Sequence, residues 1–396
     1  MGRLAGFVVF LCIVLLVLVG LHAYLWVRLI RDPQWPTPWR GIATTVLFVA
    51  GAGVPLTLLL RRTSHGAMNL LVWPGYMWIG LMFLLVVALA GADLVRLILW
   101  IGRKVGDGDG GAAAIDPMRR AFFARWIAGG ALATVAGVGT VATRAALAPV
   151  AVRRVEVPLR RLSRQQDGMT LVQLTDLHIG PTIRRRELAS LVQRTNEIAP
   201  DVVVITGDLV DGGVDELRDS VAPLADLRAK HGVFFVTGNH EYFSGASAWV
   251  REISDLGIRV LRNERVTIGP AESGFQLAGV DDRSAARYPQ DGHGEDLAKA
   301  LAGRDTNRAV VLLAHQPRTV LDSAKLDVDL QLSGHTHGGQ IWPFGFLVRL
   351  QQGFLAGLGR HGDTFIYVSR GTGYWGPPMR LVAPAEITQI VLRSAA

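Results

Sequence analysis

The stretch "DVVVITGD", residues 201–208, places five consecutive β-branched residues directly before Gly207 and Asp208. β-Branched side chains favour an extended backbone, so this run predicts a short strand that ends at a glycine and a carboxylate. In α/β sheets, functional groups gather just beyond the carboxyl ends of the strands. Asp208 is therefore a candidate functional residue, although an aspartate at a strand end also commonly caps the following helix.

The sequence on both sides of this run alternates between strand and helix patterns. "MTLVQLTD" at 169–176 predicts a strand, and "RRELASLVQRTNEIAP" at 185–200 predicts a helix that ends at Pro200. Further helices are expected at 215–230 and 246–257, and further strands at 232–241, 275–282, 309–317, 328–337, 365–371 and 385–392. This alternation predicts an α/β domain.

Five of the predicted strands end in side chains that can bind a metal or transfer a proton. The five ends read Asp176-Leu177-His178, Gly207-Asp208, Gly238-Asn239-His240-Glu241, Ala314-His315-Gln316 and Gly334-His335-Thr336-His337. They contain half of the ten histidines of the chain. A single Gly-Asp pair is ordinary turn chemistry, but five such ends predict one shared site.

The residue types at these ends suit divalent cations. Two carboxylates, one asparagine carbonyl and four imidazoles favour Mn²⁺, Fe²⁺ or Zn²⁺, and the candidate ligands are Asp176, His178, Asp208, Asn239, His315, His335 and His337. Seven ligands exceed the need of one tetrahedral ion, so we expect two ions bridged by a carboxylate, which can clamp the oxygens of a phosphoryl group. His335 and His337 would point the same way from an extended segment.

The motifs D-x-H, G-D-x-x-D-G, G-N-H-E, A-H-x-P and G-H-T-H, in this order, resemble the signature of calcineurin-like metallophosphoesterases over roughly residues 168–393. "TDLHIG", "SGHTHGGQI" and "YVSRGTG" are similar to the bacterial membrane-anchored branch of that superfamily. The resemblance implies a two-sheet β-sandwich flanked by helices. It also implies that one ion is held by Asp176, His178, Asp208 and His337 and the other by Asp208, Asn239, His315 and His335. Asp208 would bridge, and His240 would face the substrate as a catalytic non-ligand.

The first 150 residues predict a membrane region. Four stretches lack Asp, Glu, Lys and Arg and approach the roughly 20 residues that span a bilayer as a helix: Leu4–Val27, Gly41–Leu60, Leu70–Ala92 and Trp126–Thr143. We therefore expect about four transmembrane helices in 1–150, a basic linker at 151–167 and the phosphoesterase domain at 168–396. The single cysteine, Cys12, lies in the first span, which excludes a disulfide framework and a thiolate metal site.

The arginine distribution predicts which side of the membrane carries the domain. Eight basic residues flank one side of the spans, whereas Arg3, Arg61 and Arg62 share the other side with the domain. Basic loops favour the cytoplasm, so the domain is expected outside the cytoplasm of a bacterial inner membrane, with the cytoplasmic face as the alternative. "MRRAFFARWIAGGALATVAG", from Met118, resembles a twin-arginine signal-anchor, whose alternative interpretation is two ordinary interfacial arginines.

We expect a membrane-tethered, metal-dependent hydrolase that cleaves a phosphodiester, phosphomonoester or pyrophosphate bond. The alternatives are a nuclease or nucleotide phosphodiesterase, and an idle binding or sensory module that retains the fold. The intact ligand set argues against the idle module. The net charge of +8 could indicate nucleic acid, but the arginines gather near the membrane, so we expect the bilayer and a phosphoester as partners and infer no protein partner.

The apolar run "IWPFGFLVRLQQGFLAGLG", residues 341–359, leaves the nature of the substrate open. One interpretation is a core strand and helix. The other is an exposed patch, including Trp342, Phe344 and Phe346, that contacts the bilayer or the acyl chains of a lipid-linked substrate.

Overall fold

The computed structural model describes residues 2–60, 69–106, 116–288 and 294–395. It divides into two compact units, Met1–Thr143 and Arg144–Ala396. Arg61 and Arg62, which entered the orientation argument, lie outside the described residues.

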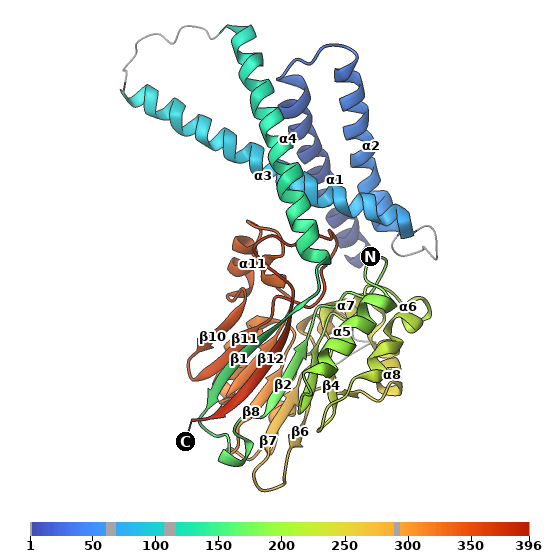
Figure 1. Cartoon of the computed structure of the whole chain (residues 1–396), viewed down its shortest axis with the longest axis vertical. Helices are drawn as coiled ribbons and strands as arrows, with labels where there is room; N and C mark the ends of the chain where they lie inside the picture. The colour runs from blue at the N-terminus through green and yellow to red at the C-terminus, as the bar shows by residue number, and fades with distance from the viewer. Residues whose placement is uncertain (1, 61–68, 107–115, 289–293, 396) are drawn as a thin grey trace. The chain divides into compact units, whose positions relative to one another are not determined.

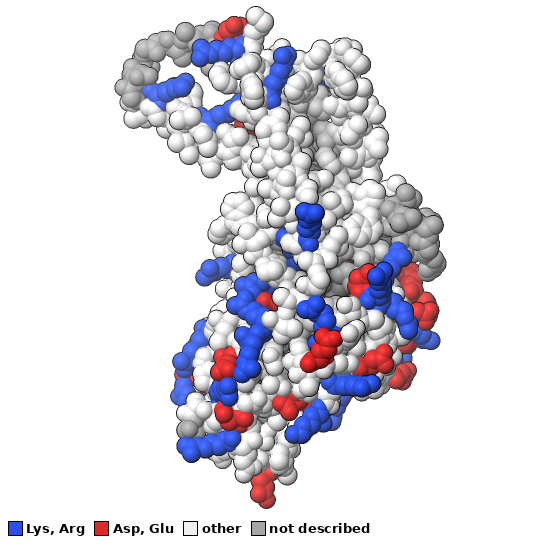
Figure 2. Space-filling view, in the orientation of Figure 1, with Lys and Arg blue, Asp and Glu red and all other residues white. Residues whose placement is uncertain are grey.

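The first unit consists of four long apolar helices, one for each of the four apolar stretches found in the sequence. They are α1 (Gly2–Trp26), α2 (Trp39–Leu60), α3 (Asn69–Gly106) and α4 (Pro117–Leu147), with a short π-helical turn η1 (Val27–Arg31) after α1 (Figure 1). Each helix contains a segment long and apolar enough to cross a membrane. In Figure 2 basic side chains appear near the end of α3 and the start of α4, beyond a largely uncharged helical surface.

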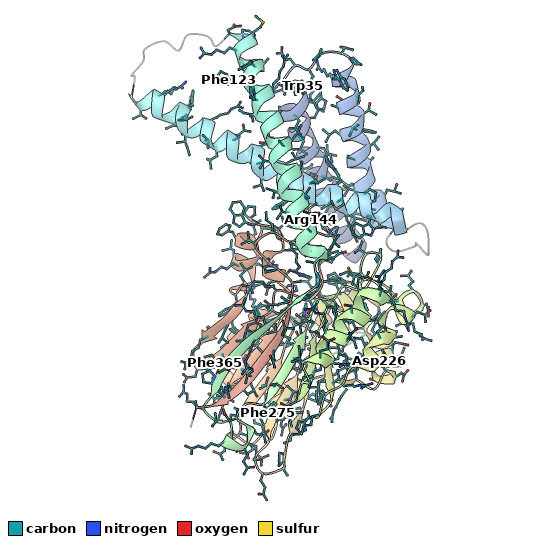
Figure 3. All side chains as sticks on the ribbon, in the orientation of Figure 1. Trp35, Phe123, Arg144, Asp226, Phe275 and Phe365 are labelled. Atoms are coloured by element: carbon teal, nitrogen blue, oxygen red, sulfur yellow. The ribbon has the colours of Figure 1, made fainter. Side chains whose placement is uncertain are left out.

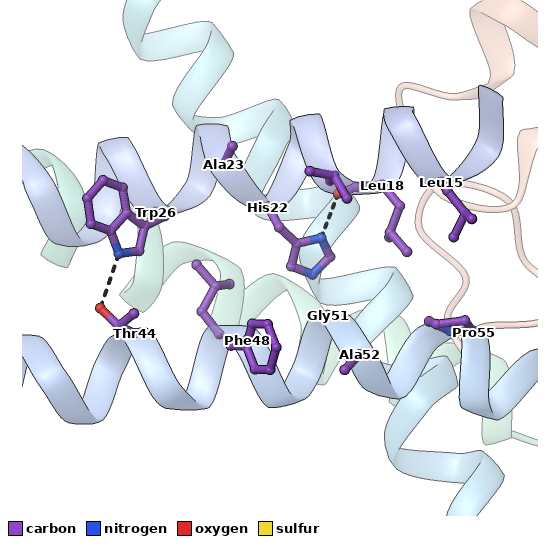
Figure 4. Close-up of a pocket in the computed structure, with 12 residues that line it drawn as sticks. Leu15, Leu18, His22, Ala23, Trp26, Thr44, Phe48, Gly51, Ala52 and Pro55 are labelled. Atoms are coloured by element: carbon purple, nitrogen blue, oxygen red, sulfur yellow. Dashed lines mark hydrogen bonds between the residues drawn. The ribbon is translucent and has the colours of Figure 1, made fainter. Parts of the chain in front are cut away.

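Polar side chains of α1, η1 and α3 are paired with one another. Asp93 of α3 accepts a hydrogen bond from the Tyr24 hydroxyl at 2.8 Å and forms an ion pair with Arg28. A cavity of about 440 Å³ lies between α1 and α2 and is lined almost entirely by apolar side chains. Figure 4 shows residues that line it. Its histidine, His22, has both ring nitrogens engaged, with the Leu18 carbonyl at 2.8 Å and the Trp78 indole at 3.0 Å. The cavity therefore presents an apolar lining.

The second unit is built on two mixed six-stranded sheets. The first sheet has the order β1-β12-β2-β3-β4-β5 and the second has β10-β11-β9-β8-β7-β6. The strands of the first sheet are β1 (Ala151–Leu159), β2 (Thr170–Leu174), β3 (Val202–Thr206), β4 (Val233–Val236), β5 (Arg259–Val260) and β12 (Glu386–Ser394). Those of the second are β6 (Glu264–Ile268), β7 (Phe275–Gly279), β8 (Val310–Leu313), β9 (Leu330–Ser333), β10 (Gly357–His361) and β11 (Thr364–Val368).

Strand periodicity explains how the two sheets form a sandwich. Val202 and Val204 of β3 join the core between the sheets, whereas Val203 and Ile205 point to the opposite face. The second sheet contributes residues such as Phe275 to the shared core; Phe275 and Phe365 are labelled in Figure 3. Because alternate residues of a strand face opposite sides, a strand of β-branched residues is buried on both faces here. The predicted two-sheet sandwich is confirmed.

Helices cover the outer faces of the sandwich (Figure 1). Leucines and valines of α5 and the fully buried Trp249 of α8 pack on the outer face of the first sheet, and leucines of α9 pack on the second. The helices are α5 (Arg185–Glu197), α6 (Val214–Val221), α7 (Asn239–Ser244), α8 (Ala246–Asp255), α9 (Leu297–Leu301), α10 (Val320–Ser323) and α11 (Gly345–Gln352). Short 3-10 turns are η3 (Arg164–Gln166), η4 (Ala222–Asp226), η5 (Arg283–Arg287), η6 (Pro317–Thr319), η7 (Ala324–Leu326) and η8 (His337–Gly339).

The predicted basic linker at 151–167 is wrong over most of its length. Residues 151–159 form strand β1, which pairs in parallel with β12 from Ala151↔Glu386 to Leu159↔Ser394. Arg153 and Arg154 belong to an exposed edge strand, whereas Val157 and Leu159 of the same strand reach the core between the sheets. Pro158 is compatible with this position because β1 is the edge of its sheet.

Candidate metal centre

Five strand ends from both sheets meet at the candidate site. β2, β3 and β4 are parallel to one another in the first sheet, and β8 and β9 are parallel in the second. Their carboxyl ends lead directly to the predicted ligands, as the sequence predicted. Hydrogen bonds join the two sheets here: the ring Nδ1 of His315 lies 2.8 Å from the Thr206 carbonyl, and the His335 amide donates to Asp176 at 2.9 Å.

One group of ligands gathers around Asp176, His178 and His337, which are all buried. The Nε2 atoms of His178 and His337 face each other at 3.0 Å, and His337 Nε2 lies 3.6 Å from Asp176 Oδ1. The nearest oxygen of Asp208 to His178 Nε2 lies at 3.9 Å. These four residues are those predicted for the first ion.

A second group gathers around Asp208, His315 and His335. Asp208 Oδ2 lies 3.1 Å from His315 Nε2, and the Nδ1 atom of His335 lies 3.2 Å from that same nitrogen. Asp208 thus borders both groups, as a bridging carboxylate must. Asn239 begins α7, the helix that follows β4, and its buried Oδ1 has no hydrogen-bond partner among the described residues.

In His178 and His315, the ring nitrogen that points away from the candidate site, Nδ1, has a hydrogen-bond partner. His178 Nδ1 lies 3.1 Å from Asp211 Oδ1, and His315 Nδ1 lies beside the Thr206 carbonyl. When these nitrogens donate, each Nε2 keeps its lone pair toward the site. The Nε2 atoms of His178 and His315 can therefore offer lone pairs to a cation, and the buried Asn239 oxygen without a partner is a further candidate ligand atom. The donor set therefore fits two divalent ions.

Most of the predicted ligands adopt a left-handed backbone conformation, which is rare for residues other than glycine. Five predicted ligands have positive φ, and they are five of the eleven non-glycine residues with positive φ in the described chain: Asp176, His178, Asp208, His335 and His337. Such conformations cost energy and cluster at functional sites. The predicted extended segment at 335–337 is wrong, because His335 (φ 70°) and His337 (φ 50°) flank a right-handed Thr336 in a tight turn.

Glycines allow the ligand loops to approach one another. Gly238 lies so close to Asp208 that an added Cβ atom would overlap its Oδ1 and backbone nitrogen. Gly334 lies equally close to Asp176 Oδ2 and Thr175 Oγ1. The glycines beside the ligand residues are thus required by close packing.

Electrostatics favour the metal-binding protonation state at three of the ligands, His335, His337 and Asp208. Burial and the neighbouring His315 charge lower the pKa of His335 to about 3, and burial together with His178 and Arg380 lowers the pKa of His337 well below its usual value. Burial alone would raise the pKa of Asp208, but the positive charges of nearby histidines hold it well below its usual value. Neutral imidazoles and an ionised carboxylate are the forms that bind metals. In contrast, burial raises the pKa of Asp176, and although burial alone would lower the pKa of His315, Asp208 raises it well above its usual value.

His240 lies beside the metal ligands and is held by a carboxylate. Its Nδ1 atom lies 2.5 Å from Asp211 Oδ1, its Nε2 atom lies 3.9 Å from Asp208 Oδ2, and its amide donates to Asp208 at 2.9 Å. Burial alone would lower the pKa of His240, but Asp208 and the Asp211 hydrogen bond raise it to about 9. The ring is also near enough to Asp208 and His178 to act as a ligand itself.

Sequence reasoning assigned no role to three residues that support the site. Asp211 contacts both His178 and His240. The buried carboxylate of Glu241 accepts the backbone amides of Asp208, Leu209 and Gly238 at 3.0, 2.8 and 2.6 Å. The second aspartate of G-D-x-x-D-G and the glutamate of G-N-H-E were visible in the sequence, but their spacing does not reveal which groups they contact.

Arg380 is the third of these residues, and it is fully buried. Its guanidinium donates to the carbonyls of Arg370 and Ala383 at 2.8 Å and lies 3.2 Å from His337 Nδ1. Burial lowers its pKa to about 10, so it remains cationic at neutral pH. It therefore fixes the loop around residues 370–383 against the turn that carries His337. No local pattern in the sequence marks a buried arginine.

Exposed aromatic side chains stand beside His240. The ring centroids of Phe243 and Trp375 lie 5.2 and 5.8 Å from that of His240, and both aromatic side chains are about half exposed.

The run at 341–359 forms the turn after the metal ligands, helix α11 and the start of β10, and its large apolar side chains between 342 and 350 are mostly exposed. They are not core residues, so the first interpretation of this run is wrong for residues 342–350.

Comparisons with known proteins agree with the motifs. A profile of the calcineurin-like phosphoesterases matches residues 169–339. The chain is 44% identical over 257 residues to a cattle protein named "transmembrane protein with metallophosphoesterase domain". This match covers 62% of this chain and 58% of the relative. It is 41% identical to an uncharacterized metallophosphoesterase of Helicobacter pylori, over 58% of this chain and 61% of the relative.

A relative of similar size to the domain is matched over most of its length. The chain is 36% identical to an uncharacterized metallophosphoesterase of Aquifex aeolicus over 56% of this chain and 84% of that protein. By contrast, the match spans less than two thirds of the cattle and Helicobacter proteins. The similarity therefore concerns the domain that carries the metal centre.

Proposed function

Because the chain belongs to the calcineurin-like phosphoesterase family, we propose that it is a membrane-tethered hydrolase that uses two divalent ions to cleave a phosphoester or phosphoanhydride bond. The observation that carries the proposal is the double cluster of ligands around Asp208, in which histidine ring nitrogens face each other at 3.0 and 3.2 Å. The proposed bonds are a phosphodiester, a phosphomonoester or a pyrophosphate.

The residues divide into two sets that share one carboxylate. Asp176, His178 and His337 would hold one ion, Asn239, His315 and His335 the other, and Asp208 would contact both. Two ions at such a site activate water for attack and neutralise the charge that develops on the phosphoryl oxygens. Asp211 orients His178, and Thr206 orients His315, so the ligands are positioned before a cation binds.

His240 is the proposed general acid. A protonated imidazole beside the site can donate its Nε2 proton to the leaving oxygen as the phosphorus–oxygen bond breaks. Asp211 holds Nδ1, which leaves Nε2 toward Asp208 and the space that the phosphoryl group would occupy. The raised pKa, about 9, keeps the ring protonated at neutral pH.

The proposal includes a lipid-linked substrate and an extracytoplasmic domain in a bacterial inner membrane. The exposed apolar side chains near the ligand turn support the first part, and the excess of arginines on the opposite side of the spans supports the second. A cysteine at exposed Asp363 (D363C) in a Cys12→Ser background tests the second part. Labelling by an impermeant maleimide in intact cells is expected; labelling only after permeabilisation would place the domain inside.

The activity itself is tested with the purified full chain. Metal is removed with a chelator, and Mn²⁺, Fe²⁺ or Zn²⁺ is returned while hydrolysis of bis(p-nitrophenyl) phosphate, p-nitrophenyl phosphate, a nucleotide pyrophosphate and lipid phosphoesters is measured. We expect activity to disappear with the metal and to return with two ions per chain. Absence of turnover on every substrate with both sites filled would contradict the proposal.

A further inference from the structure

We propose that the exposed apolar side chains beside the metal centre form a membrane-contacting surface that inserts into the interfacial region of the lipid bilayer. We call this surface the apolar collar; its residues are Phe243, Trp342, Phe344, Phe346, Leu347, Leu350, Trp375 and Val382. The consequence for catalysis rests on the proposed function, because the collar would present lipid phosphate groups to the metal ions.

Helix α11 shows the feature most clearly, because its outward face is apolar. Phe346, Leu347 and Leu350 follow one another at helical spacing and are 70%, 63% and 85% exposed. The polar Gln352 of the same helix is 6% exposed and faces inward. A helix on a soluble domain normally has the reverse arrangement, with its apolar stripe on the core. An apolar outward face indicates a surface that is covered by another phase or molecule.

The collar is continuous with the metal centre. Trp375 and Phe243 contact His240 through their rings, and the Trp375 amide donates to the Gln340 side chain at 3.0 Å. Two residues further along the chain from Gln340, the Trp342 amide donates to the Leu381 carbonyl at 3.3 Å, next to the exposed Val382. The apolar residues from α7, from the loop around 375–382 and from α11 therefore border the same edge of the site.

Two observations favour a lipid bilayer as the occupant. Only three residues, 148–150, separate the end of α4 from the start of β1, and such a segment spans about 10 Å at most. A short connection thus joins the domain to the last candidate span. Residues 338–359 contain no Asp or Glu but include the exposed Arg349 of α11, which suits anionic headgroups. Apolar side chains combined with arginine are typical of helices that lie in the interface.

The surface can be tested without measuring activity. In a Cys12→Ser background, Leu350→Cys carries a nitroxide label in the full chain reconstituted in anionic vesicles. The matched control is Leu326→Cys: Leu326 is 38% exposed and precedes β9, at the end of that strand opposite the metal turn.

We expect the label at 350 to be accessible to oxygen and shielded from a water-soluble nickel chelate, and the control to be accessible to the chelate. Exposure to the chelate at both positions would overturn the proposal. Protection of position 350 from both reagents would overturn it too, because it would show cover by protein or a second copy.

A second measurement tests the catalytic consequence. Phe346→Ser with Leu350→Ser is compared with Leu321→Ser with Leu326→Ser, which changes exposed leucines elsewhere. We expect the first pair to lower turnover of a lipid phosphoester in vesicles by roughly tenfold or more and to leave bis(p-nitrophenyl) phosphate unaffected. Equal loss on both substrates, or no loss on either, would contradict the role in catalysis. If the unmodified chain hydrolyses neither substrate, the proposed function fails, while the label still decides whether the collar meets the bilayer.

Discussion

One oxygen of Asp211 contacts His240, with Oδ1 only 2.5 Å from that residue's Nδ1. The same oxygen lies 3.1 Å from Nδ1 of His178, a proposed ligand of the first ion. One carboxylate therefore orients both a metal ligand and the proposed general acid. This arrangement couples the position of the acid to that of the metal centre.

Asp208→Asn is expected to abolish nearly all hydrolysis. Asp208 is the carboxylate that borders both groups of ligands, and an amide supplies a neutral and weaker ligand to each ion. Bound metal and turnover are measured on the same sample. Near-normal turnover with two ions bound would contradict the bridging role.

His240→Ala is expected to keep both metals and to slow turnover by roughly 10²–10⁴-fold, the usual contribution of a general acid. The loss should be smaller for a p-nitrophenyl ester than for an alkyl ester, because p-nitrophenolate leaves without protonation. His231→Ala, at the turn before β4, is the control. Loss of metal together with rate would identify His240 as a ligand instead.

Asp211→Asn is expected to move the alkaline limb of the pH–rate profile to lower pH. The proposed acid must be protonated, and the pKa of His240 is raised to about 9, with Asp211 among the causes. Loss of the Asp211 charge lowers that pKa, so the protonated fraction declines at a lower pH. The profile is measured at saturating metal, because the variant also loosens His178. An unchanged alkaline limb would show that His240 does not govern it.

Glu241→Ala is expected to lower the free energy of unfolding of the domain by roughly 3 kcal/mol or more, because it leaves three buried backbone amides without an acceptor. Glu272→Ala, at an exposed turn, should change stability by less than about 0.5 kcal/mol. Chemical unfolding monitored on metal-free protein measures both. Equal stability of the two variants would show that these amides find other partners.

Gly334→Ala is expected to weaken metal binding, because the added methyl group overlaps Asp176 Oδ2 and Thr175 Oγ1. Gly213→Ala is the matched control, since its φ of −72° suits alanine and no atom lies within 4 Å of the added carbon. Metal titration by calorimetry compares the two. Unchanged affinity in Gly334→Ala would mean that Asp176 can move aside and still bind.

The sequence alone predicted four long apolar helices and an α/β domain, and its motifs, through their resemblance to a known family, implied the sandwich and a proposed ligand set. Apolar length identified the candidate spans, and short apolar runs that end in Asp or His placed the candidate ligands at strand ends, because strand periodicity and loop chemistry are local. Local pattern failed at residues 151–159, where exposed arginines on an edge strand resemble a linker, and at 335–337, where the backbone turns instead of extending.

Only the tertiary structure decided which groups support the ligands and which face of α11 is exposed. Asp211 meets His240 from 29 residues away, and Arg380 meets His337 from 43 residues away. Such contacts depend on how the two sheets pack, and no local periodicity encodes them. The exposure of Leu350 and the burial of Gln352 likewise follow from packing, because the sequence of α11 by itself left a core helix and an exposed patch both open.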